Sequence, residues 1–325
     1  MTTRKITLVT GANGFIGRNL CQTLQEQGVR VRALLRSENE GPWDEVVIAD
    51  LAVDGLPIEY FHNVETVFHL AGKTHAVNEI NTSIDEYYLI NVEGTKKLLH
   101  TAHQAGVTKF IYCSSVKAIG EGGIIPKKET DPVLPTTYYG QTKLAAEGLV
   151  LEFKSISHTA VFRPTMVYGP GNPGNLDRLI NAISKKRFPP WPNIKNKRSM
   201  VHVDDVVQAA LLLASKNQAN RQAYNITDGN YYSTFQIIEW IRIELGYSLH
   251  KFSTPISLLK MGAKLGDLVS LIIRRKLPLT SDNLEKLIGS AAFDSSKIEN
   301  ELGFRAKWNL KRAFPDIINK SKLEN

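Results

Sequence analysis

A tyrosine and a lysine stand four residues apart in this chain, at Tyr139 and Lys143. Residues at i and i+4 share one face of a helix, whereas the neighbouring Tyr138 has Thr142 at that spacing. A phenol titrates near pKa ~10, and a nearby ammonium favours its ionised form. Ser115, 24 residues earlier, ends an expected strand and could hydrogen-bond the same substrate oxygen. These residues predict an acid–base site, and the alternative is an exposed amphipathic helix.

Three glycines near the start of the chain have the spacing of a dinucleotide-binding loop. They lie in TGANGFIG, directly after a β-branched run and at the start of a helical pattern. A pyrophosphate requires close backbone N–H groups, a tight turn without Cβ atoms and a helix N-terminus directed at it. The loop therefore predicts a nicotinamide dinucleotide, whose positive ring would further favour the phenolate. The cofactor contacts expected here are Gly11, Asn13, Gly14, Phe15, Ile16 and Gly17.

The end of the second expected strand bears on the choice of dinucleotide. An NAD site usually has Asp or Glu there to hold the ribose 2′-OH. This strand ends in Leu35-Arg36, and the planar guanidinium of Arg36 could pair with a 2′-phosphate. Glu38 and Glu40 follow closely, and Arg36 could also be an ordinary exposed side chain. The sequence therefore favours NADP and leaves NAD open.

Further cofactor contacts are expected where other strands end. The dipeptide after the third strand would suit the adenine, and the tripeptide after the fourth would pass beside the pyrophosphate. Asn91 could support Lys143 through a water or a backbone link. His69 and His202 also end strands, and we interpret both as structural because no second ligand lies at metal spacing, so no metal is expected. The contacts expected outside the glycine loop and Arg36 are Asp50, Leu51, Leu70, Ala71, Gly72, Asn91, Tyr139 and Lys143.

Strand-like and helix-like segments alternate through the first half of the chain, which is typical of βαβ units and a parallel sheet. From about residue 165 the pattern becomes irregular and rich in Gly, Pro and Asn. We predict an α/β fold, with a Rossmann-type doubly wound parallel sheet over 1–165 and a smaller C-terminal α/β domain over 166–325, between which the chain can cross. The expected strands are 6–10, 29–35, 46–49, 66–71, 110–115 and 159–164, and the expected helices are 15–27, 85–104, 138–153, 175–186, 204–215, 233–245 and 256–273.

The basic excess is confined to the second half of the chain. The sequence has 40 Lys plus Arg against 32 Asp plus Glu, a formal charge of +8. Residues 1–180 carry 17 basic and 19 acidic side chains, a net of −2, and residues 181–325 carry 23 and 13, a net of +10. A solvated face, an anionic small molecule, a membrane surface or a nucleic acid could each account for this. No nucleic-acid motif or aromatic stacking pattern is present, so we expect no nucleic-acid partner.

The sequence indicates a cytoplasmic globular protein. No apolar run reaches the roughly 18–20 uncharged residues of a membrane span, and MTTRKITLVT has no secretory segment. Cys21 and Cys113 are too few for a disulfide scaffold. The stretch over 255–276 is apolar and ends in Arg274-Arg275-Lys276, as in a helix on an anionic membrane surface. Three charged residues interrupt it, which favours packing on the body, so peripheral membrane contact stays an alternative.

The chain resembles extended short-chain dehydrogenases/reductases of the nucleotide-sugar epimerase/dehydratase family. The resemblance covers nearly the whole chain and rests on TGANGFIG, HLAG, NVEGT, CSSVKAIGE, YYGQTK, RPTMVYGPGN, RSMVHVDDV and YNITDG. It implies a Rossmann core with a C-terminal nucleotide-sugar-binding domain. It also implies catalysis by Ser115, Tyr139 and Lys143, and a homodimer.

Within that family, SSVKAIGE, RSMVHVDD and KLIGSAAFDSSKIENELGF are similar to a subgroup of UDP-hexose 4-epimerases and UDP-4-keto-6-deoxy-N-acetylhexosamine reductases, which serve surface-polysaccharide synthesis. By this resemblance Asn175 and Arg198 would hold the uridine diphosphate, and Lys117 and Glu121 would line the sugar pocket. Two features depart from typical 4-epimerases. The acid at the end of the second strand is replaced, and the arginine that such epimerases place shortly before their ADASK-like segment is absent, with Lys286 the nearest cation.

Three hypotheses for function follow. We favour an NADPH-dependent 4-ketoreductase giving a UDP-N-acetylquinovosamine type of product, because Arg36 suits an exchangeable NADPH. The alternative is a UDP-glucose or UDP-N-acetylglucosamine 4-epimerase that retains NAD. A dehydratase fits less well, since Thr136 and Thr137 occupy the place of its usual acid pair. A non-catalytic dinucleotide-binding sensor is the third hypothesis, although such proteins commonly lose the tyrosine or the lysine that this chain keeps.

Overall fold

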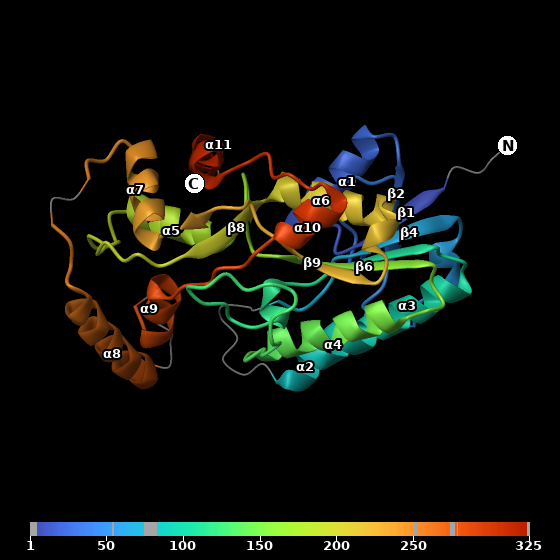
Figure 1. The fold of residues 1–325 in the computed structure, drawn as a ribbon, viewed down its shortest axis with the longest axis horizontal. Helices are drawn as coiled ribbons and strands as arrows, with labels where there is room; N and C mark the ends of the chain where they lie inside the picture. The colour runs from blue at the N-terminus through green and yellow to red at the C-terminus, as the bar shows by residue number, and fades with distance from the viewer. Residues whose placement is uncertain are drawn as a thin grey trace.

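A seven-stranded parallel sheet forms the centre of the computed structural model, which describes residues 5–53, 55–74, 83–249, 252–273, 277 and 279–323 (Figure 1). The strand order is β3-β2-β1-β4-β5-β6-β9, that of a doubly wound sheet. This confirms the expected fold class. The strands are β1 (Ile6–Thr10), β2 (Arg30–Leu35), β3 (Glu45–Ile48), β4 (Val64–His69), β5 (Lys109–Cys113), β6 (His158–Pro164) and β9 (Gln222–Ile226).

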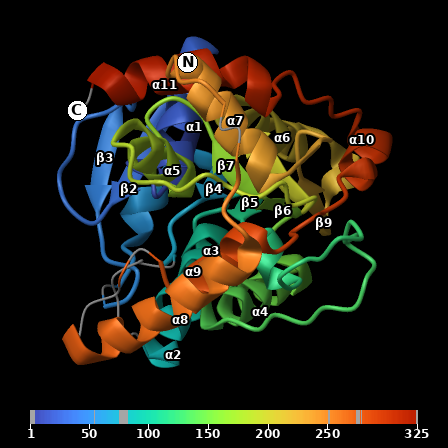
Figure 2. The same cartoon turned by 90° about the vertical axis from the view of Figure 1, so that its left-hand side faces the viewer.

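Helices cover both faces of this sheet, which is why its central strands are almost continuously apolar. On one face, α1 (Phe15–Glu26) and α6 (Val203–Ser215) pack together over the strands. On the other, α3 (Gly94–Gln104) and α4 (Tyr138–Glu152) lie side by side, below the sheet in Figure 2. The sheet therefore presents the carboxyl ends of its strands at one open edge, where ligands of such folds bind.

The segment predicted as one helix over 85–104 is interrupted by a π-helical turn. The chain forms α2 (Ile84–Tyr88), the π turn η2 (Leu89–Glu93) and then α3. Such turns arise where one residue more than the α-helical repeat is accommodated, and they are frequent at functional sites. Here the turn carries Asn91, whose side chain is buried.

A second, smaller layer follows β6. Its three-stranded sheet has the order β10-β8-β7, formed by β7 (Met166–Tyr168), β8 (Arg198–His202) and β10 (Tyr231–Tyr232). Its core holds α5 (Asn175–Ser184), α7 (Thr234–Glu244) and α11 (Leu310–Leu323). These short strands contain few β-branched residues, and of the three the sequence predicts only a strand that ends at His202, which β8 confirms.

The chain returns to the first sheet after entering the second layer. β9 pairs in parallel with β6, and both α6 and α10 (Ser296–Leu302) contribute to the core of the first sheet. Residues far beyond 165 therefore complete the Rossmann layer, while the boundary between the two domains stays a prediction. The helices α8 (Ile256–Ile273) and α9 (Ser281–Ile288) pack together at the periphery (Figure 1). Among the described residues, no helix has the length and apolar character needed to span a bilayer.

A buried ion pair fastens α4 to the sheet. Arg163 on β6 donates from Nε and Nη2 to the two carboxylate oxygens of Glu147 on α4, at 2.9 and 2.6 Å. Both side chains are almost fully buried, 7% and 2% exposed. Because this bidentate geometry satisfies both charges, either partner left alone would be a buried uncompensated group.

We expect Glu147→Gln to destabilise the protein by about 3–5 kcal/mol, because it leaves the Arg163 guanidinium buried without its counter-charge. Urea unfolding followed by circular dichroism measures this. Glu65→Gln is the matched control, since it removes the partner of the exposed Lys5 and should cost about 0.5 kcal/mol or less. Equal losses for the two variants would contradict a structural role for the buried pair.

Candidate active site

The carboxyl ends of three neighbouring strands bring the predicted residues to one edge. In the sheet register, Thr10 of β1 lies beside His69 of β4, which lies beside Tyr112 of β5. The glycine loop follows the first of these residues, Leu70-Ala71-Gly72 the second, and Ser115 comes three residues after the third. The predicted cofactor and catalytic segments thus emerge next to each other.

The glycine loop is shaped by close approaches that a side chain would block. Gly11 has a φ of +65°, and a Cβ there would lie 2.7 Å from the Ala71 nitrogen. A Cβ on Gly17 would lie 2.2 Å from the Gly11 carbonyl oxygen. The helix α1 begins after Gly14, which offers no capping side chain, and its first turn has no acid. This backbone cradle fits a dinucleotide pyrophosphate, which would accept from the N–H groups at the start of α1.

A chain of buried hydrogen bonds runs behind this cradle. The Ala71 N–H donates to Thr10 Oγ1 at 3.0 Å, and Thr10 Oγ1 lies 2.7 Å from His69 Nδ1. His69 Nε2 lies 2.9 Å from Thr95 Oγ1, whose hydroxyl donates to the Asn91 carbonyl at 2.7 Å. Because Thr95 donates its only hydroxyl hydrogen to that carbonyl, its Oγ1 accepts from His69 Nε2–H. The unprotonated Nδ1 then accepts from the Thr10 hydroxyl. Complete burial lowers the pKa of His69 to about 3, so the ring is neutral.

The Asn91 side chain connects two segments that lie near Lys143. Its side-chain amide donates to Thr142 Oγ1 at 3.1 Å and to the Lys73 carbonyl at 3.1 Å, and its Oδ1 accepts from the Lys73 N–H at 2.7 Å. A Cβ on Gly72 would lie 3.0 Å from Asn91 Oδ1 and 3.6 Å from Lys143 Nζ. The exposed Gly72 therefore leaves open the space beside the lysine that a ribose would need.

Lys143 is a buried cation with two identified contacts. Its Nζ donates to the Cys113 carbonyl at 2.6 Å and lies 4.3 Å from the centre of the Tyr112 ring. Burial lowers the pKa of this ammonium to about 8, and the Glu147 carboxylate works in the opposite direction. Tyr112 carries no sequence signal for this role, because an aromatic residue in a buried strand is ordinary.

Tyr139 and Ser115 meet because the start of α4 packs on the turn after β5. Thr137 caps α4 by accepting from the Gly140 N–H at 3.1 Å, and a Cβ on Gly140 would lie 2.4 Å from the Lys117 carbonyl oxygen. Burial raises the pKa of the Tyr139 phenol, and a hydrogen bond with the Ser115 side chain opposes that rise. The phenol therefore holds its proton at neutral pH in the cofactor-free protein, where Lys143 was expected to favour the phenolate.

The residues predicted for the adenosine end lie after β2 and β3. The Arg36 side chain is exposed, and its strand ends without a carboxylate. Asp50 Oδ1 accepts from the Ala52 N–H at 2.9 Å, while Leu51 is buried and packs beneath Gly94. Their contacts with a cofactor stay predictions.

Three of the four residues predicted to bind the nucleotide sugar, Lys117, Glu121 and Arg198, lie on two segments that both contact residues 291–293. Lys117 and Glu121 form an ion pair with each other. Arg198 donates from Nη1 to the carbonyls of Lys286 and Gly289, at the end of α9. Its strand pairs with Ala291, and that segment also lies against the loop after Glu121.

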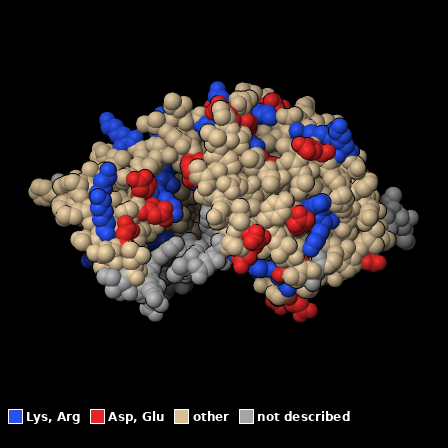
Figure 3. All heavy atoms as spheres, turned by 90° about the horizontal axis from the view of Figure 1, so that it is seen from below, with Lys and Arg blue, Asp and Glu red and all other residues tan. Residues whose placement is uncertain are grey.

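Asn175 is the first residue of α5. Seen from below, the surface is hollowed between the smaller lobe and the larger body, and basic and acidic side chains are interspersed over this side (Figure 3). The sugar-binding roles of all four residues stay predictions.

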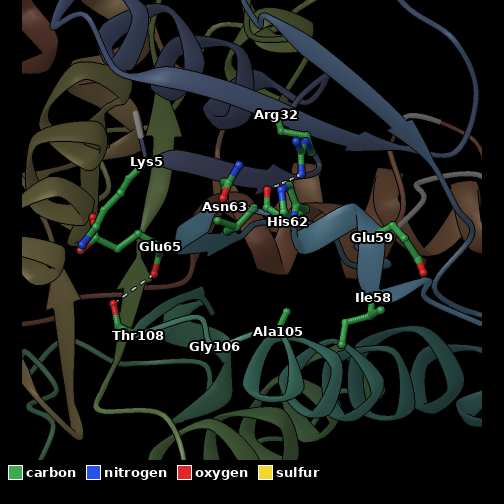
Figure 4. Close-up of a pocket in the computed structure, with 11 residues that line it drawn as sticks. Lys5, Arg32, Ile58, Glu59, His62, Asn63, Glu65, Ala105, Gly106 and Thr108 are labelled. Atoms are coloured by element: carbon green, nitrogen blue, oxygen red, sulfur yellow. Dashed lines mark hydrogen bonds and ion pairs between the residues drawn. The ribbon is translucent and has the colours of Figure 1, made fainter. Parts of the chain in front are cut away.

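A cavity of about 1190 Å³ lies at the opposite edge of the sheet, near the amino ends of β1 and β4 (Figure 4). Its cations already have partners. Arg32 pairs with Glu45 and donates to the carbonyls of Tyr60 and His62, and Lys5 pairs with Glu65. Since ligands of doubly wound sheets bind at the carboxyl ends, this groove is not the catalytic site.

Comparisons with known proteins agree with this geometry. Residues 7–227 match the NAD dependent epimerase/dehydratase family. A UDP-glucose 4-epimerase of Vibrio cholerae is 29% identical over 95% of this chain and 93% of that protein. An N-acetyl-α-D-glucosaminyl-diphospho-ditrans,octacis-undecaprenol 4-epimerase of Escherichia coli O157:H7 is 26% identical, over 93% of this chain and 91% of its own length. The solved structure of MoeE5 in complex with UDP-glucose and NAD is 27% identical and superposes with a TM-score of 0.76, covering 98% of this chain and 99% of that one.

We expect Thr95→Val to destabilise the protein by about 1–3 kcal/mol, because it leaves the His69 Nε2–H buried without an acceptor. The same change should weaken dinucleotide binding by loosening the Asn91 turn. Thermal unfolding and titration with NADH or NADPH, followed by fluorescence, measure both. Thr95→Ser keeps the hydroxyl and should lose less of each. If the serine variant were as damaged as the valine variant, packing of the methyl group and not the hydrogen bond would be responsible.

The lowered pKa of Lys143 predicts a pH dependence of cofactor affinity. Below about pH 8 the lysine is an ammonium that can donate charge-assisted hydrogen bonds, and above it the neutral amine predominates. The dissociation constant of NADPH should therefore rise by up to about tenfold for each pH unit above 8. Fluorescence titration from pH 6.5 to 9.5 tests this. Lys143→Met should bind more weakly and lose the dependence, and a wild-type constant equal at pH 7 and 9.5 would contradict the assignment.

Proposed function

This chain belongs to the NAD dependent epimerase/dehydratase family, and from that premise we propose that it is an NADPH-dependent 4-ketoreductase of a UDP-4-keto-6-deoxy-N-acetylhexosamine. As a member of the extended short-chain dehydrogenases/reductases, the chain is an enzyme with a nicotinamide-dependent chemistry. The proposal concerns its direction and its substrate. The expected product is of the UDP-N-acetylquinovosamine type.

The proposal rests on the residues at the end of β2. The strand closes with Leu35-Arg36, the Arg36 side chain is exposed, and no carboxylate stands where an NAD site usually holds the ribose 2′-OH. A guanidinium there suits the 2′-phosphate that distinguishes NADPH. A reductase consumes NADPH from solution. A binding site that selects NADPH through the adenosine end of the cofactor therefore supports reduction as the direction of the reaction.

The protonation state of Tyr139 also suits reduction. When bound, NADPH would supply a hydride to C4 of the keto sugar. Tyr139 holds its phenolic proton at neutral pH, because burial raises its pKa, and would donate it to O4 as that oxygen becomes an alkoxide. Ser115 would donate a hydrogen bond to the same oxygen. The carbonyl thus gains a hydride at carbon and a proton at oxygen, and the product is the C4 alcohol.

Lys143 would act beside the tyrosine. Its ammonium, held by the Cys113 carbonyl over the Tyr112 ring, would hold the cofactor ribose through the opening at Gly72. After the proton transfer its positive charge would stabilise the phenolate left on Tyr139. Asn91 would keep the surrounding backbone in place without touching the reacting atoms.

Arg198 is the proposed anchor for the UDP diphosphate. Its guanidinium is oriented by the carbonyls of Lys286 and Gly289, and a guanidinium presents five N–H donors that suit phosphate oxygens. Asn175 would contribute from the start of α5, and the ion pair of Lys117 with Glu121 would border the sugar. MoeE5, which binds UDP-glucose and NAD, supports a nucleotide sugar as the ligand class.

A 4-epimerase is the second candidate, favoured by the UDP-glucose 4-epimerase of Vibrio cholerae and by the NAD in the MoeE5 complex. The same three residues would first remove the proton from the O4 hydroxyl and later return it. This cycle begins with Tyr139 as a base, so it needs the positive charge of retained NAD to lower a pKa that burial raises. Glu38 and Glu40, both exposed after β2, would be the acids nearest to an NAD ribose.

We expect the purified protein to oxidise NADPH when UDP-4-keto-6-deoxy-N-acetylglucosamine is supplied, followed by absorbance at the nicotinamide band. Tyr139→Phe should slow this by about 10²–10⁴-fold, because the alkoxide loses its proton donor. Arg36→Asp should raise the KM for NADPH and improve the use of NADH, with little change in kcat.

The competing outcome has a distinct signature. Protein that retains NAD through purification, interconverts UDP-glucose and UDP-galactose or their N-acetyl counterparts, and consumes no NADPH would establish the epimerase and overturn the reductase. Mass spectrometry of the co-purified nucleotide separates NAD from NADP before any assay.

A further inference from the structure

The helix α8 exposes a long apolar stripe to solvent. Successive residues of an α-helix are rotated by about 100°, which places one set of apolar side chains on a single face. Leu265 is 58% exposed and Leu268 is 56% exposed on that face. Such a stripe far exceeds the isolated apolar side chains that are normal on a protein surface. Its members are Leu258, Met261, Leu265, Leu268 and Val269.

The opposite face of α8 is firmly packed against the protein. Leu259 and Ala263 are buried there in the core of the second, smaller layer, together with residues of α5, α7 and α11. A Cβ on Gly266 would lie 1.9 Å from the Leu279 carbonyl oxygen, which shows how closely the next segment approaches. Asp267 Oδ1 accepts from the Ser281 N–H at 3.1 Å, at the start of α9. The helix is thus fixed by one side and bare on the other.

The charges of α8 are basic where they face solvent. Lys260 and Lys264 are exposed on one flank of the stripe. Asp267 is the only acidic residue in the helix sequence, and it is engaged with Ser281 on the packed side. In the sequence Arg274-Arg275-Lys276 follow, outside the described residues. An apolar stripe beside lysines is complementary to acyl chains lying under anionic headgroups.

We propose that α8 docks this protein on the surface of an anionic lipid bilayer. The stripe enters the boundary between headgroups and acyl chains, and Lys260 and Lys264 contact lipid phosphates. The helix would lie in the plane of the membrane, because one face is packed on the protein and only the opposite face is open to lipid. Figures 1 and 2 both place α8 at the margin of the molecule beside α9, where a flat surface can reach it. The inference does not rest on the proposed reaction.

Charge decides between a membrane and a second copy of the chain. Two copies joined through this stripe would bring the lysine flanks of both helices into one interface. The single carboxylate of each helix is engaged on the packed side, so it offers these lysines no counter-charge. Lipid phosphates provide one, which favours the bilayer as the occupant.

Vesicle flotation of the full chain tests the proposal. The wild-type protein should float with vesicles of phosphatidylcholine containing 30% phosphatidylglycerol, float less with pure phosphatidylcholine, and be released by ~0.5 M NaCl, where charge screening is strong. Leu265→Glu should reduce the partition coefficient by about tenfold or more. It removes an apolar side chain that the bilayer would bury and adds a negative charge that the anionic headgroups repel. Lys260→Gln with Lys264→Gln should reduce binding to the anionic vesicles by about fivefold per lysine.

Ile243→Glu is the matched control, since Ile243 is 55% exposed on α7 and outside the stripe. It should bind vesicles like the wild type, and circular dichroism should show all variants folded. Absence of wild-type flotation, or equal losses for Leu265→Glu and Ile243→Glu, would overturn the proposal. A wild-type dimer in sedimentation that Leu265→Glu dissociates, without vesicle binding, would assign the stripe to a second copy instead.

Discussion

The buried chain of hydrogen bonds from Ala71 through Thr10, His69 and Thr95 to Asn91 is the constraint on which the site depends. Every hydroxyl in it both donates and accepts, and the imidazole is neutral because burial lowers its pKa to about 3. In a low-dielectric interior such a chain has one low-energy arrangement, since reversing any member leaves a donor facing a donor. It therefore fixes the relative positions of β1, β4 and α3, which are separated in sequence.

Two halves of the site are built outward from that chain. At one end Thr10 holds Ala71 against Gly11, so the glycine loop and the segment after β4 form one cradle. At the other end the π turn presents the Asn91 amide to Thr142, the residue before Lys143. The groups that we propose to bind the cofactor and to transfer the proton thus share one framework, and the helix α4, which carries Tyr139 and Lys143, is also held by the Glu147–Arg163 pair. Preorganisation of this kind is what an acid–base site requires.

The sequence predicts the parts of this arrangement that depend on local patterns. β-branched runs located the six strands of the first half, and residue type with i, i+4 spacing singled out Tyr139 and Lys143. The π turn at Asn91 was missed, because the apolar period of 85–104 does not reveal one extra residue in a turn. The pairing of β9 with β6 was missed as well, since it joins residues about 60 positions apart and leaves no local signal. The contact between the Tyr112 ring and Lys143 also leaves no local signal, because it forms only once β5 lies under α4.

Burial shifts the pKa values of Tyr139 and Lys143 in opposite directions, and both shifts favour the uncharged form of the group. It raises the pKa of the phenol and lowers that of the ammonium, so each group is pushed toward its neutral form. At neutral pH the phenol keeps its proton while Lys143, below its pKa of about 8, is an ammonium, so the protein without ligands holds no phenolate–ammonium pair. In the reduction that we propose, the substrate oxygen develops negative charge and changes this balance: the phenol gives up its proton to that oxygen, and the resulting phenolate raises the affinity of Lys143 for its own proton. The charge that the proposed site would stabilise best is thus one generated during reaction, which is the condition for lowering a barrier without tightening the ground state.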